Sequence, residues 1–298
     1  MELARIGGAN TEPAYLFGQI TFIAIADDNS VFVVDGQLNM IRHYDPRGVY
    51  LAHVGRAGEG PGEYREIKGM LMLPSGELVV LSNPNRLTFF DGRSGAYLRD
   101  FTVRSLLSSP RMLECDSAGF VYVKDVDGTP PMDAEWSKVW LKIDAAGKEA
   151  AVIPIPMENQ APKAFHLYFP EGHRENFVVA TKSALSRDGH VVSGRNDRYA
   201  FDIQGDPLVH IERDVEPVEL VKEERSEWQA WARRFSRGGE TYEIPKAKPA
   251  YREIYVDTDG LIWVHRYVAA RKVKLDPRPP GDDRPLSTWR EPNTFDVF

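Results

Sequence analysis

The chain has 298 residues, of which 42% are hydrophobic and 27% are charged, and its formal net charge is -7 at pH 7. This balance is typical of a well-packed globular protein and does not fit an intrinsically disordered chain. Nucleic-acid binding needs a cationic surface that neutralises phosphates, so we expect no nucleic-acid partner for this acidic chain.

The sequence contains no transmembrane segment and no signal peptide. No apolar run reaches the length of a membrane span, and the N-terminal residues Met1 to Gly7 lack the apolar core of a leader. The single cysteine, Cys115, cannot form an internal disulfide, and we expect it to be a buried, inert thiol.

A short turn with Gly or Ser, followed by a β-branched or aromatic run, occurs five times along the chain. These runs are Val31–Asp35, Glu77–Val80, Phe120–Val123, His190–Val192 and Leu261–Val264. The first three turns are about 45 residues apart, as in a propeller blade of four strands, and the later spacings of about 70 fit the same blade with an insertion. Such repeats stack so that neighbouring units complete one core.

The repeats predict an all-β protein, a β-propeller of four-stranded blades that forms a single domain over 1–298. The expected blades are 20–55, 67–103, 111–156, 180–215 and an incomplete fifth at 251–298, with a closing strand at 3–6. If that strand pairs with Thr294–Val297, five blades could close into a ring and the protein would be a monomer. Otherwise the edge strand stays open and prone to aggregation.

Three segments of the first repeat carry a family resemblance: Val31–Asp35, Ile41–Asp45 and Val54–Tyr64, the last containing Gly-Arg-Ala-Gly-Glu-Gly-Pro-Gly-Glu-Tyr. With these segments the chain resembles bacterial six-bladed β-propeller proteins related to NHL repeats. The resemblance implies six blades, so we expect this chain to be a truncated fragment. It also implies an extracytoplasmic protein that is periplasmic, secreted or lipid-anchored, since family members usually begin with an export signal.

The long connections all fall on one rim of the predicted propeller. They occupy 126–138, 157–180, 216–250 and 267–292, and each joins the second and third strands of a blade or links two blades. The turns at the opposite rim stay short. Loops on a rigid scaffold often carry function, so we place the binding surface on this insertion rim. The alternative is that these insertions are tolerated without any role.

The insertion at 216–250 contains a predicted helix over 218–237. Pro217 suits its first turn and Gly238 its end. Val221, Trp228, Trp231 and Phe235 form one apolar stripe. We expect this stripe to pack the helix down as a lid, and the alternative is ligand or partner contact by the two tryptophans.

The glycine-rich loop Gly55–Gly62 does not fit a phosphate-binding loop. It lacks the Lys-Ser/Thr ending of a nucleotide loop, and Glu59 and Glu63 would repel phosphate. We expect a structural connection between blades, in which the glycines permit tight turns.

Basic residues stand at the starts of several innermost strands, which should surround the mouth of a central channel. The candidate ligand-binding residues are Lys68, Arg111, Lys182 and Arg252, together with Arg195 and Arg266 near the same rim. Such cations would favour an anionic ligand. The alternative is that Glu66, Glu114 and Glu253 pair with them as structural ions. Basic positions disfavour a metal centre here, so we expect no metal and no cofactor.

The remaining catalytic candidates are His166, Glu171, His173 and Glu175. They could bind metal or transfer protons, although their spacing matches no specific metal-site motif. The sequence therefore favours a non-enzymatic module that binds a protein or a small molecule that is polar or anionic. The alternative is a propeller hydrolase or lyase that uses this His/Glu cluster.

Overall fold

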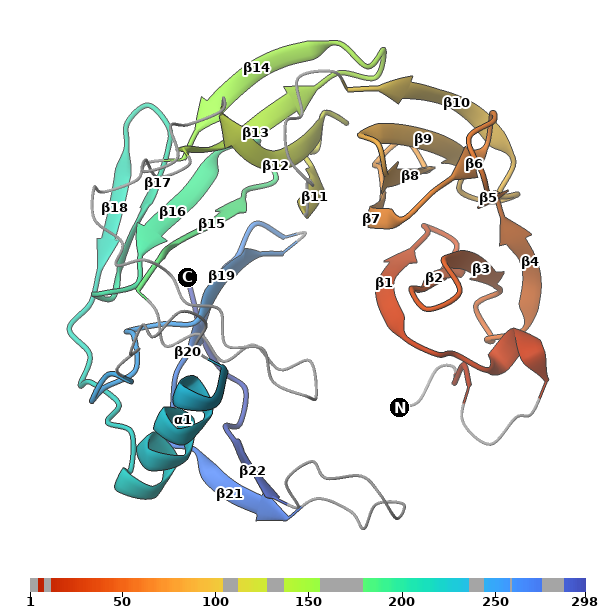
Figure 1. Cartoon of the computed structure of the whole chain (residues 1–298). Helices are drawn as coiled ribbons and strands as arrows, with labels where there is room; N and C mark the ends of the chain where they lie inside the picture. Colours follow the sequence, from red (N-terminus) through yellow and green to blue (C-terminus); the bar gives the residue numbers. More distant parts are fainter. Residues whose placement is uncertain are drawn as a thin grey trace. The chain divides into compact units, whose positions relative to one another are not determined.

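A computed structural model describes residues 5–7, 12–103, 112–127, 137–155, 179–235, 244–257, 259–274 and 287–298. The chain divides into two compact units, Met1–Ile155 and Pro156–Phe298. Each unit is built from antiparallel sheets that follow one another along the chain (Figure 1).

The first unit contains three four-stranded antiparallel sheets and a short 3-10 helix, η1 (Pro13–Tyr15). The first sheet is β1 (Ile20–Ile25), β2 (Val31–Asp35), β3 (Met40–Tyr44) and β4 (Tyr50–Val54). The second is β7 (Ile67–Met72), β8 (Glu77–Ser82), β9 (Arg86–Asp91) and β10 (Tyr97–Thr102), and the third is β11 (Met112–Cys115), β12 (Val121–Asp127), β13 (Ser137–Ile143) and β14 (Glu149–Pro154). The link between the first two sheets contains the short parallel pair β5 (Arg56–Ala57) and β6 (Glu63–Tyr64).

The middle sheet of this unit is buried on both faces. Side chains alternate along a strand, so Leu78 and Val80 of β8 pack in one apolar cluster with the first sheet. Val79 and Leu81 of the same strand pack in a second cluster with the third sheet. Strand β7, the first strand of this middle sheet, lies against β1 of the first sheet and β11 of the third sheet. Face-to-face stacking of four-stranded antiparallel sheets confirms the predicted all-β propeller architecture.

The second unit contains one four-stranded sheet, one three-stranded sheet, a two-stranded hairpin and one helix. The four-stranded sheet is β15 (Thr181–Leu185), β16 (Val191–Arg195), β17 (Ala200–Ile203) and β18 (Val209–Glu212). The three-stranded sheet is β19 (Glu253–Val256), β20 (Ile262–Arg266) and β23 (Thr294–Val297), with the hairpin β21 (Arg271–Lys274) and β22 (Ser287–Arg290) inserted before β23. Apolar side chains of both sheets share one core, and β15 lies against β19.

An aspartate at the end of a strand shapes the recurring short turns. Asp45 accepts hydrogen bonds from the backbone N–H groups of Arg47 and Val49, at 2.9 and 2.8 Å. Asp116, Asp144 and Asp257 each bond the N–H groups two and four residues later in the same way. The glycine three residues after each aspartate has a positive φ of 79–84°. This geometry explains the repeated Asp-x-x-Gly pattern, because glycine adopts positive φ without strain.

The helix α1 (Lys222–Phe235) confirms the predicted helix but begins later than expected. Leu220 N–H bonds to Lys246 O, and Lys248 N–H bonds to Val218 O, which holds residues 218–220 in an extended bridge. The predicted apolar stripe also differs, because Val221 is exposed whereas Leu220 and Trp228 are buried. The side chains of Trp231 and Phe235 lie outside the described part of the chain.

The expected closing strand at 3–6 has no counterpart in the described residues. Arg5 and Ile6 belong to no strand, and residues 3 and 4 lie outside the described ranges. Arg5 and Ile6 instead pack beside Gly48 in the turn between β3 and β4, where an added Cβ would lie 3.2 Å from atoms of both residues.

Candidate functional site

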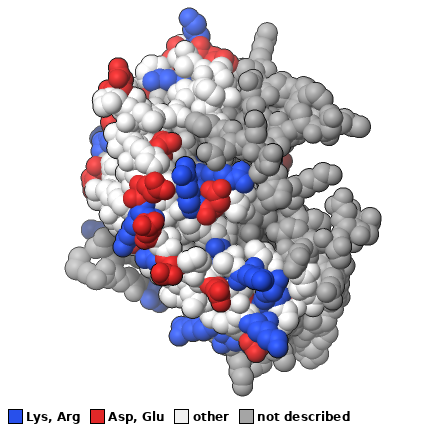
Figure 2. Space-filling model, turned by 90° about the vertical axis from the view of Figure 1, so that its left-hand side faces the viewer, with Lys and Arg blue, Asp and Glu red and all other residues white. Residues whose placement is uncertain are grey.

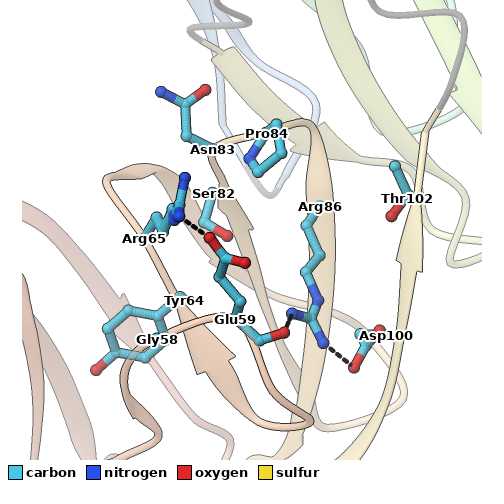
Figure 3. A pocket seen from close by; sticks show the side chains of 10 residues that line it. All are labelled: Gly58, Glu59, Tyr64, Arg65, Ser82, Asn83, Pro84, Arg86, Asp100 and Thr102. Carbon is cyan, nitrogen blue, oxygen red and sulfur yellow. Dashed lines mark hydrogen bonds and ion pairs between the residues drawn. The ribbon is translucent and has the colours of Figure 1, made fainter.

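A polar pocket of about 360 Å³ opens in the first unit. We call it the rim pocket; its lining residues are Gly58, Glu59, Tyr64, Arg65, Ser82, Asn83, Pro84, Arg86, Asp100 and Thr102 (Figure 3). Strand register places it at one end of the second sheet, because Ser82 pairs with both Ile67 and Arg86, and Arg86 pairs with Thr102. The connections at this end belong to the predicted insertion rim.

The glycine-rich loop forms one wall of the rim pocket by closing around Glu63. The Glu63 carboxylate accepts hydrogen bonds from Gly60 N–H at 2.8 Å and from Arg56 Nε at 2.7 Å. These bonds hold the pKa of Glu63 below its usual value, the Gly60 bond having the larger effect. Gly58 has φ +154°, and a Cβ there would collide with the Glu63 carboxylate. The loop connects two blades, as predicted from its sequence, and also shapes the pocket.

Opposite charges are paired around the opening. Arg86 donates to Asp100 Oδ2 at 2.6 Å and to the backbone oxygen of Glu59 at 2.6 Å, and Arg65 forms an ion pair with the Glu59 carboxylate. Burial raises the pKa of Asp100, but hydrogen bonds from Arg86 and Tyr97 outweigh it and hold that pKa below its usual value. Two guanidinium groups therefore face two carboxylates, and the lining carries no net charge (Figure 3).

Beneath the charged groups lies a buried polar floor. The Ser82 side chain is buried, and its Oγ has no hydrogen-bond partner within the protein. Tyr64 is fixed by donating from its hydroxyl to Val54 O at 2.8 Å, and burial raises its pKa to about 12. Buried polar groups usually have a partner, so the Ser82 hydroxyl marks a place where a bound molecule could supply one.

The candidate cation Lys68 lies close by in sequence and space. Its Nζ donates to Glu66 Oε1 at 2.5 Å, and this bond is the main reason that the pKa of Glu66 is lowered. The other oxygen of Glu66 accepts from Asn83 Nδ2 at 3.0 Å, which links Lys68 to the pocket lining. Arg111, the second candidate of this unit, lies outside the described residues.

The candidate cations of the second unit all face carboxylates. Lys182 of β15 pairs with Glu253 of β19 at 3.4 Å, so this pair crosses from one sheet to the next. The other pairs are Arg195–Asp197 at 3.0 Å, Arg266–Asp296 at 3.6 Å and Arg252–Glu291 at 3.5 Å. An anionic ligand at these positions would compete with carboxylates that are already present. Ligand binding by these residues stays a prediction.

Arg195 also lines a smaller cavity of about 70 Å³ between neighbouring strands of the four-stranded sheet. His210 and Asp202 contribute to the same cavity, and their side chains are 2.6 Å apart. Hydrogen bonds to Asp202 and then to Glu212 raise the pKa of His210. This cavity is too small for more than a few atoms of a ligand.

Sequence reasoning missed a buried charge cluster in the second unit, which we call the buried junction: Glu224 of α1, Lys248 and Glu291. Lys248 Nζ lies 3.2 Å from Glu224 Oε1 and 2.5 Å from Glu291 Oε1, and it also donates to Val268 O at 3.2 Å. The exposed side-chain fractions are 0% for Lys248, 3% for Glu224 and 9% for Glu291. The only available sequence signal was the i, i+4 spacing of Glu224 and Trp228, which are both buried on one side of the helix.

The buried junction ties together two insertions of the rim. Glu224 and Lys248 come from the insertion at 216–250, and Glu291 follows the β21–β22 hairpin of the insertion at 267–292. A second, exposed ion pair joins Lys272 of that hairpin to Glu227 of α1, and Figure 1 shows the helix beside the hairpin. Burial raises the pKa of Glu224, although the adjacent Lys248 ammonium opposes this shift.

The described surface mixes both signs of charge. Figure 2 shows acidic and basic side chains interspersed in small groups on the face that it presents. Exposed ion pairs such as Arg198–Glu212 are consistent with this mixture. Among the described residues, no group of three or more His, Cys, Asp or Glu side chains is arranged to hold a metal ion. The predicted cluster of His166, Glu171, His173 and Glu175 lies outside the described ranges.

Comparison with solved structures gives distant similarities. A Bacteroides fragilis protein described as exported is 10% identical, with a TM-score of 0.49 over 89% of this chain and 69% of its own. Virginiamycin B lyase from Staphylococcus aureus is 13% identical, with a TM-score of 0.44 over 84% of this chain and 66% of the lyase. A Bacteroides caccae protein of unknown function is 11% identical, with a TM-score of 0.42 over 84% of this chain and 71% of its own. These similarities are too distant to assign an activity.

No curated protein sequence matches the chain. In the described part of the chain, no helix has the length and apolar character needed to cross a bilayer. Residues 10–151 match a protein family described as a 6-bladed beta-propeller, which agrees with the six-bladed propeller expected from the first repeat, whereas the relation to NHL repeats stays a prediction. The chain is therefore a β-propeller protein, and its N-terminal half matches the 6-bladed beta-propeller family.

Proposed function

We propose that this protein is a non-enzymatic binding module that holds a polar ligand in the rim pocket. The observation that carries the proposal is the pocket itself, about 360 Å³ in volume and lined by donors and acceptors from three segments of one compact unit. Its volume falls in the range of small-molecule sites, and polar groups that converge from separate segments can fix the orientation of a ligand. The paired guanidinium and carboxylate groups offer hydrogen bonds without a reacting centre.

The proposal also places the protein outside the cytoplasm. Its support is the resemblance of Val54–Tyr64 to exported bacterial propellers, which concerns the compartment and not the ligand. Fractionation of the native host would test this part. Recovery of the protein in the cytoplasm would contradict it.

Ligand binding in the rim pocket is tested with a variant whose larger side chain fills the pocket. Thr102 is exposed at the end of β10 and lines the opening, so Thr102→Trp adds volume there without disturbing the buried core. Saturation-transfer NMR is recorded with glucose, galactose, glucose 6-phosphate, galacturonate, glutamine and lysine as probes, because this method detects weak binding. We expect at least one probe to bind the unaltered protein and to lose at least about tenfold in affinity, or about 1.4 kcal/mol, in Thr102→Trp.

The matched control is Arg47→Ala, in the exposed turn between β3 and β4 at the other end of the strands. This variant should retain the binding of the unaltered protein. The proposal is wrong if no probe binds, or if every probe that binds does so equally well to Thr102→Trp.

A further inference from the structure

We infer that the ligand of the rim pocket is a neutral, polyhydroxylated molecule of the size of a sugar residue. This inference rests on the proposed function and adds the chemical class of the ligand. The sequence led us to expect an anionic ligand at the cations that begin the innermost strands. The present inference concerns the rim pocket, whose lining residues are different ones. Three features of the pocket carry it: its charge balance, its hydrogen-bonding groups and its floor.

The charge balance disfavours a net anion. Each pocket guanidinium already has a carboxylate, Asp100 for Arg86 and Glu59 for Arg65. A phosphate or carboxylate that approached either arginine would also approach one of these acidic side chains. The attraction and repulsion would largely cancel, so an ionic ligand would lose its hydration without a compensating gain.

A hydroxyl group suits this lining because it both donates and accepts hydrogen bonds. It can accept from Arg65 or Arg86 while donating to Glu59 or Asp100, and both ion pairs can stay intact. An ionised carboxylate group can only accept, and an ammonium group can only donate. A zwitterionic amino acid could use both signs, but it would have to compete with the existing pairs, whereas hydroxyl groups can bridge them.

The floor adds a further polar contact for such a ligand. Ser82 lines the pocket and its buried Oγ has no hydrogen-bond partner in the protein, so a ligand hydroxyl is a partner of suitable chemistry for it. Asn83 also lines the pocket, and its side-chain amide is anchored by donating to Glu66 at 3.0 Å. A volume of about 360 Å³ lies near the lower limit of small-molecule sites, which favours one small ring over an extended chain.

The test compares matched pairs of probes that share a ring and differ in charge: glucose with glucose 6-phosphate, and galactose with galacturonate. Dissociation constants are measured by NMR titration on the unaltered protein and on Thr102→Trp. We expect the neutral member of each pair to bind at least about fivefold more tightly, and Thr102→Trp to abolish the difference.

Two variants change the charge balance by the same amount while keeping side-chain size: Asp100→Asn and Glu59→Gln. Each leaves one arginine of the pocket without its carboxylate, so each should raise the affinity for glucose 6-phosphate relative to glucose by at least about threefold. Arg47→Ala, outside the pocket, should leave the ratio unchanged. Asp100 is partly buried and Glu59 is exposed, so Glu59→Gln keeps the test valid if Asp100→Asn perturbs folding.

The outcomes separate the two proposals. If an anionic sugar, glutamine or lysine binds more tightly than the neutral sugars in a manner that Thr102→Trp abolishes, the ligand class is wrong and the binding function stands. If no probe binds in a manner that depends on the pocket, both the ligand class and the proposed function are contradicted.

Discussion

The rim pocket and the buried junction use the same side-chain chemistry in different surroundings. In the pocket, Arg65 and Glu59 form an ion pair whose side chains are 60% and 63% exposed. In the junction, Lys248 and Glu224 are 0% and 3% exposed. Water can replace either partner of the first pair at little cost, whereas it cannot reach the second. Exposed pairs are therefore available to a ligand, and buried pairs hold elements together.

The energetic expectations differ accordingly. Exposed ion pairs contribute about 0–1 kcal/mol to stability, because solvent screens them and long side chains lose entropy. A buried pair contributes little in net terms, but removal of one partner leaves a charge without compensation and costs about 3–5 kcal/mol. Substitution of single residues can therefore distinguish the two regions.

The largest effect is expected for Lys248→Met, which leaves the buried Glu224 without its cation, whereas Glu291 keeps the more distant Arg252 at 3.5 Å. Methionine is close in length, so packing changes little. We expect unfolding of the second unit to be easier by about 3–5 kcal/mol. Urea unfolding followed by tryptophan fluorescence measures this change.

Lys68→Met is the matched control, because Lys68 also forms a 2.5 Å pair but with the exposed carboxylate of Glu66. It should cost no more than about 1 kcal/mol. If Lys248→Met and Lys68→Met lowered the free energy of unfolding equally, burial would not explain the expected difference between the junction and the pocket.

A smaller effect is expected for the pH dependence of stability in Glu224→Gln. Burial raises the pKa of Glu224 in the folded protein above its unfolded value of about 4.3. The folded chain then binds this proton more tightly than the unfolded chain. The stabilisation is full below the unfolded pKa and is lost as pH rises through the folded pKa. Glutamine cannot titrate, so in this variant the free energy of unfolding should no longer fall with rising pH through the titration of residue 224.

Urea unfolding at a series of pH values from 4 to 8 measures this difference. Glu227→Gln is the control, because Glu227 lies on the same helix in an exposed pair with Lys272. Because solvent screens an exposed pair, this control should change the free energy of unfolding by no more than about 1 kcal/mol. A constant stability difference between Glu224→Gln and the unaltered protein across this range would refute the role of Glu224. The change in the free energy of unfolding caused by Glu224→Gln should be smaller than that caused by Lys248→Met, because in Glu224→Gln the Lys248 ammonium keeps Glu291 as a partner.

The sequence was a good guide wherever structure depends on local repeats. The strand runs, the aspartates that bond turn N–H groups and the glycines of positive φ recur at fixed offsets, so the repeating strand of each sheet could be located from the sequence. In the second sheet, the expected run 77–80 lies within the observed strand Glu77–Ser82. Helix α1 was also predicted from the sequence, but its first residue was predicted wrongly. Residues 218–220 are extended because they are hydrogen-bonded to residues 246–248, and this partner segment is distant in sequence.

The charge pairs could not be predicted in the same way. The alternative drawn from the sequence paired Glu253 with its neighbour Arg252. In the structure Glu253 lies beside Lys182, 71 residues away, because β15 and β19 are adjacent. Lys248 and Glu291 are 43 residues apart and follow no periodic pattern. The rim pocket was missed for a related reason, since its walls come from a loop, a turn and a strand end that only the register brings together.

The buried junction also limits how this protein can be altered. Because Lys248 is held by carboxylates from two separate stretches of chain, we expect neither stretch to keep its conformation if it is transferred alone to another scaffold. An engineer who grafts α1 must carry Lys248 and the chain around Glu291 with it. During evolution, too, substitutions in these two stretches should be accepted as compensating pairs more often than singly.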